Sequence, residues 1–194
     1  MDVIFSDRST RHGYPCDIVI SALQKYIRLG ETEKAVHCAY ELYLTDGELT
    51  EYVWRRILVI SVEDICLGEP YAPVLMEALY RISRNFRYDD VDYSMFFVHA
   101  IRYLCMCKKE RGSCNLKSVM KRRIKRGAEL ELPDTACDMH TKLGQQMGKN
   151  MLDFLSEGSR VVPEVDVDGN TWKEELYRLV QEELGVPANG ENLS

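Results

Sequence analysis

The sequence of 194 residues has no long hydrophobic run, although 45% of its residues are hydrophobic. Its uninterrupted apolar runs last only a few residues, whereas a helix that crosses a bilayer needs roughly 20. The first residues also lack the basic and apolar regions of a secretory signal. We therefore expect a cytoplasmic protein with one compact domain, a tail and no membrane association.

Paired cysteine motifs are missing as well. Seven cysteines are scattered without the spacing of a small disulfide-rich protein, so reduced and mostly core-filling thiols are expected. No C-x-x-C pair is present to begin a tetrahedral zinc site, and we expect neither a metal nor a cofactor. Two alternatives stay open: zinc bound by Cys105, Cys107, Cys114, Cys137 and His140, or a thiol-protease pair of Cys137 with His140 or His99.

The charge is unevenly distributed along the chain. From Glu157 to Ser194 there are nine acidic and three basic residues, and this segment carries the whole net charge of -6. Within the neutral remainder, the segment from Cys105 to Arg126 holds nine basic residues and one acidic residue. We predict a helical domain at 1–156 and an acidic tail at 157–194, with a linker, one helix and a disordered end.

Strand signals are absent, and apolar residues recur at the three- to four-residue spacing of helices. We predict an all-α protein: a compact bundle of about seven helices and a C-terminal amphipathic helix. Gly30 is expected to end the first helix and Thr32 to cap the second. The predicted helices span 17–29, 32–44, 50–66, 72–86, 92–107, 115–127, 141–155 and 172–184.

The helix expected at 115–127 is the best candidate for a binding surface. Its basic residues recur one turn apart, and such a row can contact phosphates without regard to base sequence. Aromatic residues do not interleave with them, so base stacking on a single strand is not supported. The alternative is a basic face that is only solvated or that pairs with the acidic tail. The candidate nucleic-acid-binding residues are Lys117, Lys121, Arg122, Lys125 and Arg126.

The other side of this helix is apolar. Helices in a compact domain turn their apolar side inward, so we expect this side to face the core. Its residues are Leu116, Val119, Met120 and Ile124.

An acidic pair, Glu63 and Asp64, interrupts the apolar run of the helix predicted at 50–66. Neighbours on a helix point about 100 degrees apart, so the two carboxylates cannot converge on one substrate or proton. We favour a polar edge of a buried helix, compensated by a nearby arginine or backbone amide. A catalytic pair is the alternative interpretation.

Two stretches of the sequence, "DIVISALQKYIR" (17–28) and "RRILVISVEDICLGEP" (55–70), are similar to a known family. They resemble the C-terminal region of the MgsA/RarA family of AAA+ ATPases, which includes the Werner helicase-interacting protein. The likeness covers about residues 11–107, and Cys66 stands where the family pattern has Gly. The matching positions are Asp17, Ser21, Ala22, Lys25, Arg28, Arg55, Arg56, Ser61, Glu63, Asp64, Leu67, Gly68 and Pro70.

This resemblance implies a helical domain, like the collar of a clamp loader, that oligomerises, as tetramers in the ATPases, and works at stalled replication forks. We find no ATPase part: in "GQQMGKN" (144–150) the glycine spacing is too short for a phosphate-binding loop, and Asn150 replaces the required Ser or Thr. We therefore expect a standalone non-enzymatic homo-oligomer that associates with replication or repair proteins, and with DNA through non-specific phosphate contacts. The alternative is a phage or mobile-element protein that inhibits or redirects a host DNA-processing complex.

Overall fold

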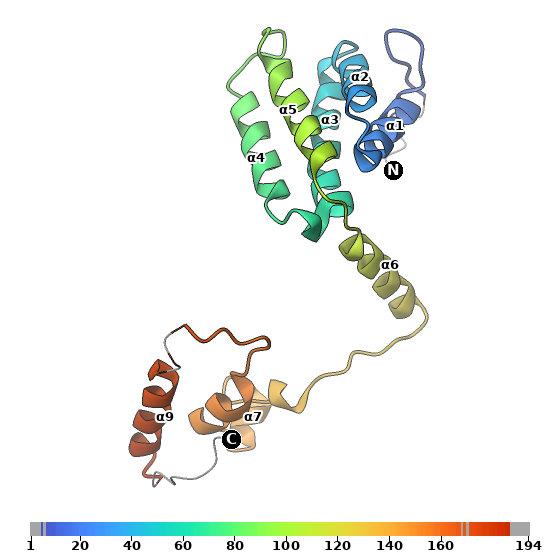
Figure 1. The fold of residues 1–194 in the computed structure, drawn as a ribbon. Helices are drawn as coiled ribbons and strands as arrows, with labels where there is room; N and C mark the ends of the chain where they lie inside the picture. Colours follow the sequence, from blue (N-terminus) through green and yellow to red (C-terminus); the bar gives the residue numbers. More distant parts are fainter. Residues whose placement is uncertain (1–4, 6, 168, 170, 187–194) are drawn as a thin grey trace. The chain divides into compact units, whose positions relative to one another are not determined.

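The computed structural model describes residues 5, 7–167, 169 and 171–186, and no strand occurs in these ranges (Figure 1). The predicted all-α class is confirmed. By its internal contacts the chain divides into two compact units, residues 1–128 and 129–194. The boundary after residue 156 that charge and composition suggest stays a prediction. Among the described residues, no helix combines the length and the apolar character needed to span a membrane.

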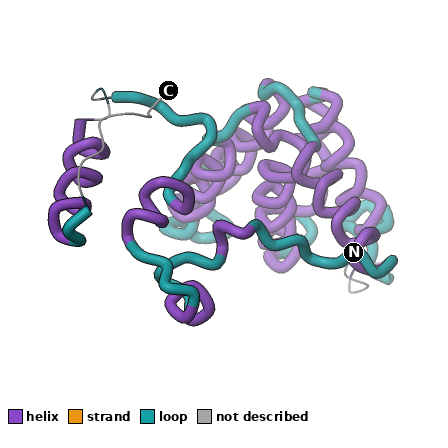
Figure 2. Tube along the Cα trace, turned by 90° about the horizontal axis from the view of Figure 1, so that it is seen from below, coloured by secondary structure: helices purple, strands orange, loops and turns teal. Residues whose placement is uncertain are grey.

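The first unit is a helical bundle. Consecutive helices are joined by short connections, which favours antiparallel neighbours, and α2 also packs on the distant α5 (Figures 1 and 2). Gly30 ends the first helix in the left-handed conformation with a φ of 75°, as predicted. The bundle consists of α1 (Cys16–Leu29), α2 (Thr32–Tyr43), α3 (Gly47–Ile60), α4 (Ala72–Ser83) and α5 (Tyr93–Met106).

The predicted cap of α2 is wrong. Thr32 is the first residue of the helix, and the cap position belongs to Glu31, which makes no side-chain hydrogen bond there. The two-residue connection after α1 leaves too little chain for Thr32 to precede the helix.

The core of the bundle combines two fully buried aromatic side chains with a larger number of aliphatic ones. Trp54 and Phe97 are fully buried, and the Trp54 indole donates a hydrogen bond of 3.2 Å to the Tyr93 hydroxyl. Burial of one large apolar side chain stabilises a fold by about 1.5–3 kcal/mol. Among the described residues, the buried hydrophobic side chains lie in this unit, apart from Val180, so it holds most of the stabilising contacts. Fully buried aliphatic residues are Leu23, Ile27, Leu42, Leu49, Ile57, Ile60, Ile65, Met76, Ile101 and Leu104.

The end of α3 departs from the regular helix predicted to residue 66. The chain passes into a π-helical turn, η2 (Ser61–Ile65), and then a 3-10 turn, η3 (Cys66–Gly68). Cys66 has a φ of 49°, a conformation that favours glycine. A Cβ on Gly68 would lie 2.5 Å from the Lys108 carbonyl oxygen, so only glycine fits where the chain after α5 passes.

The helix α6 (Gly112–Lys125) begins beside η2 and extends from the bundle (Figure 1). None of its residues is buried. The expectation that its apolar side faces the core is therefore wrong. The reason is positional, because α6 packs mainly on the small turn η2 and no helix of the bundle covers its apolar side.

The second unit contains short helical segments: η4 (Asp134–Ala136), α7 (Lys142–Gln146), α8 (Met151–Asp153), η5 (Phe154–Gly158) and α9 (Thr171–Glu183). The prediction of one continuous helix at 141–155 is wrong. The chain turns at Gly148, which has a φ of 75°, and restarts at Asn150, which forms a capping box with Asp153. The helix predicted at 172–184 is confirmed by α9. Most of the end predicted to be disordered lies outside the described residues.

Candidate nucleic-acid interface

The acidic pair lies in η2, and its two carboxylates have different surroundings. Asp64 is completely buried and accepts hydrogen bonds from Arg28 Nε and Gln24 Nε2, each at 2.8 Å. Arg111 Nε lies 3.0 Å from Asp64 Oδ1, and its Nη2 lies 3.3 Å from Glu63 Oε1. Two arginines, Arg28 and Arg111, thus compensate the buried charge of Asp64. The expected compensation of a buried carboxylate by arginine is confirmed.

Arg111 also fixes the start of α6. Burial disfavours its charge, but the Asp64 carboxylate and the Cys114 side chain outweigh that and raise the pKa of Arg111. The backbone makes a second connection here, because the Glu110 amide donates to the Asp64 carbonyl over 3.0 Å. Side chain and backbone therefore anchor the basic helix to the same turn of the bundle.

The basic residues predicted to contact phosphate lie together on α6. All five are exposed, and the helix from Gly112 to Lys125 contains no acidic residue. Lys117, Lys121 and Lys125 follow at four-residue intervals, about 6 Å apart along the axis. Arg122 Nη1 donates to the Ser118 carbonyl over 3.0 Å, which holds its guanidinium along the same helix. Arg126 follows directly as the C-cap residue.

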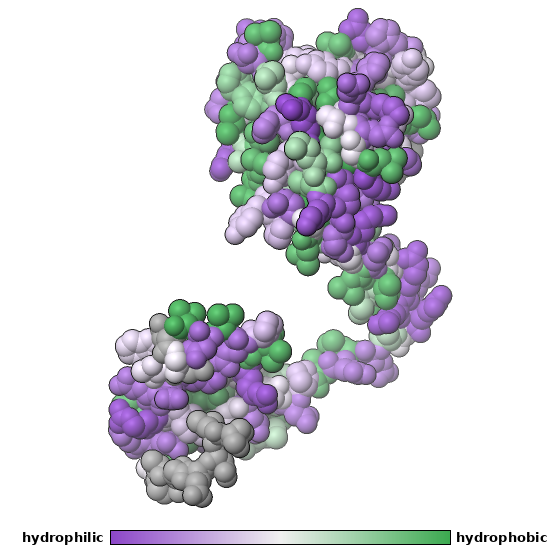
Figure 3. Space-filling view, in the orientation of Figure 1, coloured by the Kyte–Doolittle hydropathy of each residue, from purple (hydrophilic) through white to green (hydrophobic). Residues whose placement is uncertain are grey.

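The other side of α6 is apolar and exposed, so the helix presents two faces to solvent. In Figure 3 hydrophobic side chains lie on one side of α6 and hydrophilic side chains on the other. The basic face has the chemistry to contact phosphates, but a phosphate backbone offers nothing that would bury the apolar face. The exposed fractions of Leu116, Val119, Met120 and Ile124 are 62%, 42%, 40% and 64%.

All seven cysteines are free thiols. Cys105 is buried, Cys107 donates to the Tyr103 carbonyl over 3.2 Å, and burial raises the pKa of both thiols. In the part of the chain that the structure describes, no group of three or more His, Cys, Asp and Glu side chains is placed to hold a metal ion. The zinc alternative therefore has no geometric support in that part.

His140 lies in the second unit, and its surroundings are structural. Its Nδ1 lies 3.2 Å from Asp138 Oδ2, and its ring meets the Phe154 ring edge-on at 4.8 Å. The hydrogen bond from His140 lowers the pKa of Asp138. Thr141 caps α7 by accepting from the Gly144 amide over 3.0 Å. His140 is thus oriented by Asp138, and the structure gives no support to a pair with Cys137.

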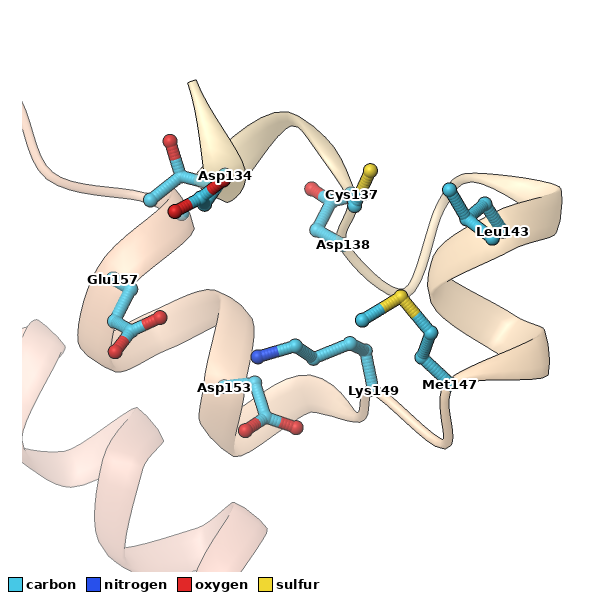
Figure 4. A pocket seen from close by; sticks show the side chains of 10 residues that line it. Asp134, Cys137, Asp138, Leu143, Met147, Lys149, Asp153 and Glu157 are labelled. Atoms are coloured by element: carbon cyan, nitrogen blue, oxygen red, sulfur yellow. The ribbon is translucent and has the colours of Figure 1, made fainter. Parts of the chain in front are cut away.

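A cavity of about 340 Å³ in the second unit was not foreseen from the sequence. In Figure 4 the Lys149 side chain extends into it towards Glu157 and Asp153. Asp134 and Asp138 add two more acidic side chains to the lining, and Leu143 and Met147 supply an apolar part. These residues come from η4, α7, α8, η5 and the connections between them, and no local sequence signal predicts that these segments meet.

Comparison with known proteins agrees with the sequence pattern. A family model described as "MgsA AAA+ ATPase C terminal" matches residues 18–160. The chain is 29% identical over 134 residues to Replication-associated recombination protein A of Bacillus subtilis (strain 168). That alignment covers 69% of this chain and 31% of the relative, so the chain spans about a third of the relative's length.

Proposed function

Because the chain belongs to the MgsA AAA+ ATPase C-terminal family, we propose that it is a non-enzymatic helical module that self-associates and works with replication or repair proteins in the cytoplasm. The name of the Bacillus relative, a replication-associated recombination protein, supports a role in replication or repair. The family match to a C-terminal region supports a role in interaction rather than in nucleotide hydrolysis.

Within this function, the basic face of α6 contacts DNA. The observation that carries the proposal is a row of exposed lysine and arginine side chains on a helix without any acidic residue. Each Lys or Arg that neutralises a phosphate releases counterions, so binding is indifferent to sequence and falls steeply with salt. The nine acidic residues from Glu157 onward repel the duplex and compete with it for the lysines and arginines of α6. Binding of DNA by the intact chain is therefore weak.

Fluorescence polarisation of a labelled duplex across a salt series tests this contact. The proteins compared are the intact chain, a chain ending before Glu157, and Lys121→Glu/Lys125→Glu. We expect the truncation to bind more tightly. The double variant should bind more weakly, with the slope of log affinity against log salt reduced by about two.

Arg81→Glu/Arg102→Glu is the matched control, since it changes the net charge equally on exposed positions of α4 and α5. It should retain most of the binding. If neither the intact chain nor the truncation binds at low salt, the basic face is only solvated and the DNA contact is rejected.

Self-association is tested separately by light scattering at micromolar concentration. The proposal requires a mass that is a multiple of the 22.4 kDa chain. A strict monomer under these conditions would contradict it, whatever the DNA result.

A further inference from the structure

The apolar side of α6 needs a partner that the DNA contact does not supply. Met120 and Ile124 lie one turn apart and border the lysine row on the helix surface. This surface has an apolar strip beside a row of cations and contains no anions. It therefore fits a partner helix that is also apolar on one side but has carboxylates along the edge of its apolar strip. Charge complementarity thus defines the chemistry of the partner.

The helix α9 has this chemistry. Its apolar residues Trp172, Leu176 and Leu179 are exposed, and Val180 is its one buried residue. On the helix surface, Glu175 and Glu182 border this apolar strip, and both also pair with Arg178 of the same helix, at 3.9 and 2.5 Å. The helix lies outside residues 18–160, the part of the chain that the family model matches. The acidic residues of α9 are Glu174, Glu175, Glu182 and Glu183.

We propose that the apolar and basic surface of α6 binds α9 of a second copy of this chain. The proposal rests on the self-association proposed above and names the surfaces that achieve it. Apolar side chains of the two helices bury each other, while glutamates along α9 lie against the lysines of α6. Because each copy offers both helices, two copies exchange the same contact reciprocally and form a closed dimer.

This pairing also links assembly to DNA binding. The glutamates of α9 pair with the lysines that otherwise contact phosphate. The dimer contact and the DNA duplex therefore compete for the same row of lysines on α6. Added DNA therefore weakens dimerisation, and dimerisation weakens DNA binding by the same factor. The competition accounts for the expected gain in DNA affinity when the acidic tail is removed.

The first experiment measures dimerisation by sedimentation equilibrium of full-length variants over a concentration series. Met120→Glu/Ile124→Glu places like charge opposite α9, and the dimer dissociation constant should rise about tenfold or more. Both positions are exposed, so the fold should be retained, which circular dichroism checks. Val74→Glu/Ile18→Glu, at exposed apolar positions of α4 and α1, is the matched control and should leave dimerisation unchanged.

Charge reversal gives the specific readout. Lys121→Glu/Lys125→Glu and Glu175→Lys/Glu182→Lys should each weaken dimerisation on their own. When the two double variants are mixed, both contacts of the heterodimer are complementary, one with the native charges and one with the charges reversed, so the heterodimer should be tighter than either variant's homodimer. Restoration by mixing supports α6 and α9 as partners in different copies.

The outcomes separate this inference from the broader function. If the wild type self-associates but neither the α6 variants nor the charge reversals change its dissociation constant, the interface is wrong while self-association stands. If the wild type is a monomer throughout, both are overturned, and the DNA contact remains a separate question.

Discussion

The helices α3 and α6 each span 14 residues and each has an apolar side, but the apolar side is buried in α3 and exposed in α6. Seven residues of α3 are buried, whereas none of α6 is. Helix α3 has neighbours on both sides in the bundle, but α6 packs mainly on the turn η2. An apolar strip on a helix therefore predicts that a contact is needed, without indicating whether its own fold or another chain supplies it.

The largest effect should come from Asp64, which joins the bundle to the start of α6. Asp64→Ala removes the carboxylate shared by Arg28 and Arg111 and leaves partly buried cations without it. Removing one partner of a buried pair costs about 3–5 kcal/mol, so the free energy of unfolding should fall by that amount. Urea denaturation measures it.

Glu63→Ala is the matched control for this substitution. Glu63 pairs with Arg111 at 3.3 Å but remains partly exposed, so its loss should cost less than about 1 kcal/mol. Equal costs for the two substitutions would show that burial does not distinguish the two carboxylates.

A smaller loss is expected at Gly68. In Gly68→Ala the new methyl group would lie 2.5 Å from the Lys108 carbonyl oxygen, so the backbone must move. We expect a loss of about 1–3 kcal/mol in urea denaturation. Gly47→Ala provides the contrast, because its nearest neighbour would be 4.0 Å away and helix propensity should make it neutral or slightly stabilising. A neutral Gly68→Ala would argue against the close passage of the chain at this turn.

Sequence-based prediction succeeded for the helical class and for some helix ends, and it failed to identify partners that are distant in the sequence. Gly30 ends α1 as predicted, whereas Thr32 was wrongly expected to cap α2, because it is the first residue of that helix. Arg111 contacts a carboxylate far away in the sequence, so the sequence predicted that Asp64 needs an arginine but not which one. The break between α7 and α8 was missed because Met147 and Met151 continue an apolar period across Gly148.

Cys66 should show a gain in stability rather than a loss. Its φ of 49° is costly for a residue with a Cβ, and the family pattern has Gly at this position. Cys66→Gly removes this strain but also the 2.9 Å contact between the Cys66 thiol and Ser113 Oγ. We expect a net gain of about 0.5–1 kcal/mol in the free energy of unfolding. Cys66→Ala keeps a Cβ and loses the thiol, so it should be less stable than wild type; a more stable Ala variant would refute the role of backbone strain.

The smallest effect on the fold should come from the apolar side of α6. Leu116→Ala/Ile124→Ala shortens two exposed side chains on a helix without buried residues, so the stability of dilute monomer should change by less than about 0.5 kcal/mol. Leu104→Ala in α5 is the control, because the same truncation in the core should cost about 2–5 kcal/mol.

The dependence of the denaturation midpoint on protein concentration then shows whether the apolar side of α6 binds a second copy or only faces solvent. If this side binds a second copy, the denaturation midpoint of the wild type should rise with protein concentration, because association stabilises the folded state. The midpoint of Leu116→Ala/Ile124→Ala should stay nearly constant over the same range. A cost in dilute solution comparable to that of Leu104→Ala would instead mean that α6 is covered within its own chain, and the contrast between α3 and α6 would disappear.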